Sequence, residues 1–133
     1  MQNPQIVRLA TGEVKTPIHL GRIPSVWAQE LGSSTRWVML SFYSLTKQFA
    51  RHRDFMLSSY EEVEWILENG EVIVDVRENV LHFVGDTRGT CGYRTKVTVK
   101  AARSRDAIFL TSAHRLRERD YERLKRQRRR AEN

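Results

Sequence analysis

The spacing of apolar residues changes near residue 71, and this change restricts the chain to few folds. Before residue 71 the apolar residues recur at helical spacing, and after it they alternate within short segments. Four such segments, at 72–76, 80–84, 93–101 and 107–113, are typical of β-strands joined by turns. Helices followed by consecutive strands predict an α+β fold with an antiparallel sheet.

Three helices are expected before these strands and one after them. They span residues 25–31, 41–54, 58–70 and 117–130, and short strands are expected near 16–20 and 36–40. In the second helix Leu45, Phe49 and His52 fall at i, i+4 and i+7, so His52 projects from the same stripe as two core candidates. At the start of the third helix, Ser59 and Glu62 have the spacing of a capping box.

The chain has 133 residues, which fits one domain. We expect an N-terminal extension at 1–15, an α+β domain at 16–116 and a basic C-terminal helix or arm at 117–133. From His114 onward the chain carries nine of its 23 Lys and Arg residues but only four of its 16 acidic residues. Such an arm is typical of proteins that bind a nucleic acid, an acidic protein or an anionic membrane. The alternative is a helix end that is only solvated.

Several classes of protein are excluded by what the sequence lacks. A single cysteine, Cys91, excludes a disulfide framework and a multi-cysteine zinc site. No apolar run reaches the ~18 residues of a membrane helix, and the first 20 residues contain no signal-peptide core. Glycine-rich phosphate loops and the common hydrolase motifs are also missing. We therefore expect a cytoplasmic site of action, with no membrane partner, no cofactor and no metal.

The residues left for chemistry are histidines and cations. Cleaving RNA without a metal requires a base for the 2′-hydroxyl, an acid for the leaving 5′-oxygen and positive charge near phosphorus. Histidine suits both proton transfers, and Lys or Arg supplies the charge. His52 and His114 are the candidates for the proton transfers, and Lys96 and Lys100 lie on one predicted strand. Each also has a structural interpretation, as a core-edge histidine, a helix-cap residue or the wet face of a strand.

A set of short segments keeps a familiar order along the chain. In sequence they read IHLGRIP, VMLS, KQFARH, SSYEEVEWILENGEVI, VTVK and FLTSAHR. From about Thr16 to Arg126 the chain thus resembles the phage-associated barnase–EndoU–colicin–RelE-like nuclease domains. These domains lie at the C-termini of Mu-F-type phage head morphogenesis proteins and related polymorphic toxins.

The resemblance implies N-terminal helices packed on a curved, four-stranded antiparallel sheet, with the site on its open face. It also implies a metal-independent ribonuclease toxin that cleaves tRNA or other RNA. The residues that match the family's site are His52, Lys47, Lys100, Ser112 and His114. With their chemistry and their neighbours taken together, the expected catalytic residues are His52, His114, Lys100, Ser112 and Thr111, and the expected substrate-binding residues are Lys47, Lys96, Arg94, Arg115 and Arg53. The chain departs from the family pattern at Gln48, where a histidine is common, and at Arg53, where a proline is usual.

RNA is the expected partner, and the resemblance is compatible with an immunity (antitoxin) protein and with a larger phage or toxin polypeptide. Two alternatives stay open. One is a catalytically inactive nucleic-acid-binding or phage structural module, which would retain RNA or DNA without turnover. The other is a regulatory or inhibitor protein whose arm binds an acidic partner.

Overall fold

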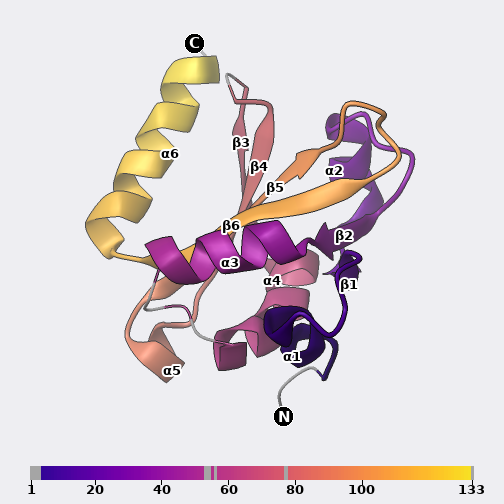
Figure 1. Ribbon diagram of the computed structural model, residues 1–133. Helices are drawn as coiled ribbons and strands as arrows, with labels where there is room; N and C mark the ends of the chain where they lie inside the picture. The colour runs from indigo at the N-terminus through magenta and orange to yellow at the C-terminus, as the bar shows by residue number, and fades with distance from the viewer. Residues whose placement is uncertain (1–3, 53–54, 56, 77, 133) are drawn as a thin grey trace.

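The computed structural model describes residues 4–52, 55, 57–76 and 78–132 of the chain. Figure 1 shows the elements in order: α1 (Pro4–Thr11), β1 (Ile18–Arg22), α2 (Ser25–Glu30), β2 (Trp37–Leu40), α3 (Phe42–Arg51), η1 (Leu57–Glu62), α4 (Val63–Asn69), β3 (Glu71–Asp75), β4 (Val80–Gly85), α5 (Arg88–Cys91), β5 (Arg94–Ala101), β6 (Ile108–Leu116) and α6 (Glu118–Glu132). The α+β class predicted from the sequence is confirmed. None of these helices has the length and apolar character needed to cross a membrane.

The sheet is larger than predicted. It has six strands in the order β1-β2-β6-β5-β4-β3, whereas a four-stranded antiparallel sheet was expected. The four expected strands do form an antiparallel unit, but β2 adds to β6 in parallel, with Val38 opposite Ile108 and Met39 opposite Phe109. Such parallel pairing joins segments far apart in the sequence, so no local pattern of residues reveals it. The sheet is therefore mixed.

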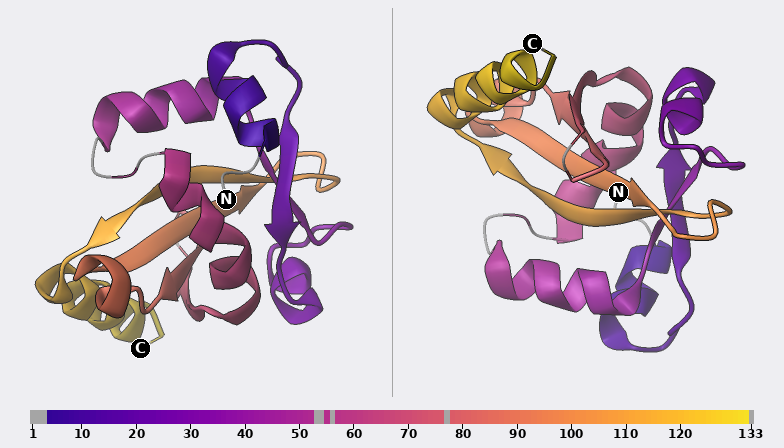
Figure 2. Two further views of the ribbon diagram at one scale, coloured as in Figure 1. Left: turned by 90° about the horizontal axis from the view of Figure 1, so that it is seen from below. Right: turned by 90° about the horizontal axis from the view of Figure 1, so that it is seen from above.

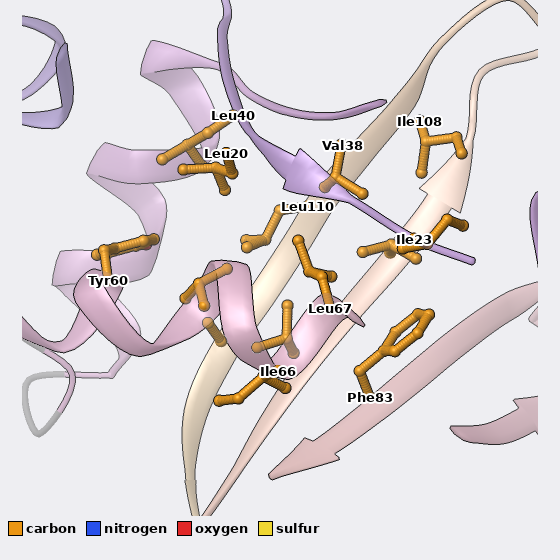
Figure 3. Close-up of a cluster of buried hydrophobic side chains, with 14 of the residues drawn as sticks. Leu20, Ile23, Val38, Leu40, Tyr60, Ile66, Leu67, Phe83, Ile108 and Leu110 are labelled. Carbon is orange, nitrogen blue, oxygen red and sulfur yellow. The ribbon is translucent and has the colours of Figure 1, made fainter. Parts of the chain in front are cut away.

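The main core lies between one face of the sheet and the helices α1, α3 and α4. In Figure 3, Ile66 and Leu67 of α4 point toward Leu110 of β6 and Phe83 of β4, and all four are fully buried. Helix α1 falls in the stretch expected to be an extension, yet its Ile6 and Leu9 belong to this core. Ile6 and Leu9 do have the i, i+3 spacing of a helix, but eight residues make only about two turns, which is too short a segment for the spacing to identify α1.

Helix α6 packs on the opposite face of the sheet. Its Tyr121 joins Ile73, Val84 and Leu116 in a second buried cluster, with Leu124 packed against it. The two views of Figure 2 show α3 and α6 on opposite sides of strands β5 and β6. The predicted basic helix is therefore anchored to the domain at its start, through the apolar residues that the sequence offers there.

Two local predictions need correction. The helix expected from residue 58 begins as the 3₁₀ segment η1, and Ser59 and Glu62 do not form a capping box, because their side chains bind Arg115 instead. Strand β6 continues to Leu116, beyond the expected end at 113. His114 and Arg115 are therefore strand residues whose side chains lie on opposite faces of the sheet.

Candidate active site

The two histidines expected to carry catalysis lie side by side. The ring centroids of His52 and His114 are 4.5 Å apart, and their planes differ by 21°. His52 is the C-cap of α3, where its backbone N–H donates to the carbonyl of Gln48, and His114 lies in β6. Because these elements are distant in the sequence, only the tertiary fold brings the two rings together.

Gln48 holds α3 against β6 and thereby positions His52. Its side chain is buried, and its Oε1 accepts a hydrogen bond of 3.1 Å from the backbone N–H of Ala113. Strand β2 pairs with β6 only at Ile108 and Phe109, so in the described structure the later part of β6 is an edge. A buried edge N–H needs an acceptor, and Gln48 supplies one. The sequence showed Gln48 only as a departure from the family pattern.

Lys96 on β5 lies directly opposite His114 on the neighbouring strand β6. The two residues are paired between β5 and β6, so their side chains share one face. Burial lowers the pKa of the Lys96 ammonium, while the carboxylates of Asp120 on α6 and Asp75 on β3 act in the opposite direction. The structure thus places a half-buried lysine beside the histidine pair, on the face that α6 flanks.

His82 extends this face toward β4 and is held by two neighbours. Its Nδ1 lies 2.8 Å from Thr98 Oγ1, and its Nε2 lies 3.7 Å from a carboxylate oxygen of Asp75. Burial and the charge of Lys96 lower the pKa of His82 to about 4, and Asp75 opposes that shift. His82 is therefore neutral at pH 7, and its contacts with Thr98 and Asp75 give it a structural role on this face.

We expect His82 to make the protein less stable in acid. Its pKa is about 4 in the folded chain against an ordinary 6.5, so the unfolded chain binds a proton more readily between these values. The free energy of unfolding therefore falls as the pH drops from 6.5 toward 4, by on the order of 3 kcal/mol. Urea unfolding at pH 7 and pH 4.5 should show a larger loss for the wild type than for His82→Gln. Equal losses would contradict this role.

Lys100, Ser112 and Thr111 were also expected at the site, and they lie further along β5 and β6 from Lys96 and His114. Lys100 is exposed four positions along β5 from Lys96, which is about 13 Å for an extended strand. Ser112 is paired with Thr98, and the Thr111 hydroxyl donates to the Thr98 carbonyl at 3.3 Å. These residues lie between Lys100 and His114, as neighbours of the histidine pair.

The remaining expected residues take other positions. Arg115 lies on the core face and pairs with Glu62 at 2.8 Å, and Arg94 pairs with Glu118 at 3.0 Å at the end of the sheet. Lys47 is exposed on α3, and Arg53 lies outside the described residues. The structure therefore brings together His52, His114 and Lys96, and it does not bring Arg115 to them.

The comparisons with known proteins add no relative. No protein-family model, curated protein or solved structure matches this chain. In the ranges that the structure describes, no three His, Cys, Asp or Glu side chains are grouped to hold a metal ion. The residues that the sequence did not single out, Gln48, Asp75 and Asp120, gave no local signal because their roles depend on partners distant in the sequence.

Proposed function

We propose that this protein is an endoribonuclease toxin domain that cleaves RNA by acid/base catalysis without a metal. The observation that supports it most is the stack of His52 on His114, with Lys96 paired across the sheet from His114. A base, an acid and a positive charge are the three requirements for cleavage through the 2′-hydroxyl, and two imidazoles and an ammonium can supply them.

The geometry restricts where the reacting phosphate binds. Rings whose centroids are 4.5 Å apart leave no room for a phosphate between their planes, so we place it at their edges. Nδ1 of His114 is buried, so His114 acts there through Nε2. One imidazole then removes the proton from the 2′-hydroxyl as its oxygen attacks phosphorus. The other donates a proton to the departing 5′-oxygen, and the Lys96 ammonium stabilises the negative charge that develops on the phosphoryl oxygens.

Polar side chains on the same face extend the site beyond the reacting phosphate. Ser112 and Thr111 lie next along β6 from the histidine pair, and the exposed Lys100 follows on β5. Hydroxyl and ammonium groups of this kind bind phosphate and sugar oxygens of a nucleic acid strand without reading its sequence. We assign them to the neighbouring nucleotides of the bound RNA.

Incubation with total RNA tests the proposal. The purified chain should degrade RNA in excess EDTA as fast as in magnesium, and the RNA should stay intact with His52→Ala. Retention of RNA without degradation under either condition would indicate the binding or structural module instead.

The basic arm is expected to contribute affinity rather than chemistry. Arg117, Arg119 and Arg126 are exposed on or beside α6, so neutralising them to Gln should weaken RNA binding. The slope of log affinity against log salt should become shallower by about 2, since each lost single-strand phosphate contact removes ~0.7. Cleavage at low salt should persist. Arg103→Gln, in the exposed turn between β5 and β6, is the control, and an unchanged slope in the triple variant would contradict the arm's role.

A further inference from the structure

An exposed stack of three side chains lies on β1, which is an edge strand, and on its neighbour β2. The ring of His19 lies on that of Trp37, with centroids 4.7 Å apart and an interplanar angle of 21°. The guanidinium carbon of Arg22 lies 5.3 Å from the Trp37 ring centroid. Trp37 is 42% exposed, and His19 and Arg22 are exposed as well. The stack therefore presents aromatic surface and positive charge to solvent, outside the hydrophobic core.

A pocket adjoins this stack between α1 and β1. It has a volume of about 280 Å³, and Gln5, Arg8, Val14, Pro17, Ile18 and His19 line it. This is near the lower end of small-molecule pockets, roughly 300–1,000 Å³, and suits a single planar ring. Because His19 belongs to both features, the pocket and the stack adjoin each other at this residue.

The chemistry of these walls matches a nucleotide. Val14, Pro17 and Ile18 offer apolar contacts to a ring. Arg8 borders the pocket, and its guanidinium suits a phosphate. Aromatic side chains among cations are the general arrangement by which proteins bind single-stranded nucleic acid.

We propose that the pocket and the His19–Trp37–Arg22 stack together bind one nucleotide of single-stranded RNA. The base lies against His19, and the flanking phosphates lie near Arg8 and Arg22. The identity of the strand as RNA rests on the proposed function. This subsite is separate from the histidine pair, because its residues belong to α1, β1 and β2.

Helix α3 connects the two sites. It packs against α1 near its start and reaches His52 at its end, and its ten residues span about 15 Å. Lys47 and Arg51 are exposed on the last two turns of α3, just before His52. A strand held in the pocket can therefore follow these cations to the histidine pair, so the subsite sets how far the cleaved bond lies from an anchored base.

Binding of a strand that cannot be cleaved tests the subsite. A labelled 2′-O-methyl hexanucleotide lacks the attacking hydroxyl, and fluorescence anisotropy gives its affinity. Trp37→Ala and His19→Ala should each weaken binding by about tenfold, the usual order for losing one stacked base. Trp65→Ala is the matched control, because Trp65 is 57% exposed on α4 and belongs to neither site. Equal affinities of Trp37→Ala and Trp65→Ala would overturn the inference.

A second measurement distinguishes a nucleotide of an RNA strand from a free mononucleotide as the ligand. Nuclear magnetic resonance with a free mononucleotide should shift the indole N–H signal of Trp37 and leave that of Trp65 in place, with weaker binding than the strand shows. Tighter binding of the mononucleotide would overturn the assignment to RNA.

Cleavage of unmodified RNA by the same preparations distinguishes the two proposals. Cleavage together with binding that does not depend on Trp37 refutes the subsite alone. Binding that depends on Trp37 without any cleavage refutes the ribonuclease and leaves a nucleotide-binding surface.

Discussion

His52→Ala and His114→Ala should each lower the rate of RNA cleavage by about 10²–10⁴-fold, the usual contribution of a positioned acid or base. Each change removes one of the two proton-transfer groups, whose rings lie 4.5 Å apart. The double variant should lose more than either single variant but less than the product of the two losses, because the two groups act on one reaction. Initial rates on a fluorescent RNA oligonucleotide in excess EDTA measure all three.

The pH profile separates a catalytic loss from a structural one. The wild-type rate should follow a bell-shaped curve, with one limb from the base and one from the acid. Each single variant should retain residual activity that lacks one limb. Trp65→Ala serves as the control for an exposed aromatic substitution, and circular dichroism confirms that each variant is folded. Full activity of either histidine variant, or multiplicative losses in the double variant, would contradict a cooperating pair.

Arg115→Met should lower the free energy of unfolding by about 3 kcal/mol, the order expected for breaking a buried ion pair. The Arg115 side chain is 13% exposed, and its guanidinium donates to Glu62 at 2.8 Å and to Thr95 at 2.6 Å. It also donates to Ser59 and lies over the Phe55 ring. Removing it leaves the Glu62 carboxylate, itself 26% exposed, without its cation. Urea unfolding at pH 7 measures the loss.

The matched control is Arg123→Met. The side chains of Arg123 and its partner Asp120 are 59% and 42% exposed, and exposed pairs contribute about 0–1 kcal/mol, so this variant should lose much less stability. Glu62→Gln combined with Arg115→Met should recover part of the loss, because it removes the uncompensated charge. If Arg115→Met keeps its stability but no longer binds RNA, the substrate-binding role expected from the sequence is right and the structural role is wrong.

The fold was predictable where its signals are local. Alternation over residues 93–101 predicted a strand, and β5 spans Arg94–Ala101. The pairing of β2 with β6 was not predictable, because it depends on contacts between distant segments. The two strands that the prediction left outside the sheet, β1 and β2, also carry the Trp37 stack.

The site was predictable by residue type but not by geometry. Histidine chemistry and the order of segments identified His52 and His114, which the fold then places in contact. Arg115 was grouped with His114 as its sequence neighbour, but adjacent strand residues point to opposite faces, so Arg115 joins the core face instead. Gln48, in contrast, was not expected at the site. Its role depends on the backbone N–H of Ala113, which is left without a strand partner only in the folded sheet.

The products of one defined substrate test the central claim most directly. The substrate is a DNA oligonucleotide that contains a single ribonucleotide, incubated with the intact chain in excess EDTA and analysed by mass spectrometry. Attack by the 2′-oxygen predicts one cut, directly after the ribonucleotide, which leaves a 2′,3′-cyclic phosphate on one fragment and a 5′-hydroxyl on the other. An uncut substrate, cuts within the DNA, or fragments with a 3′-hydroxyl and a 5′-phosphate would contradict it.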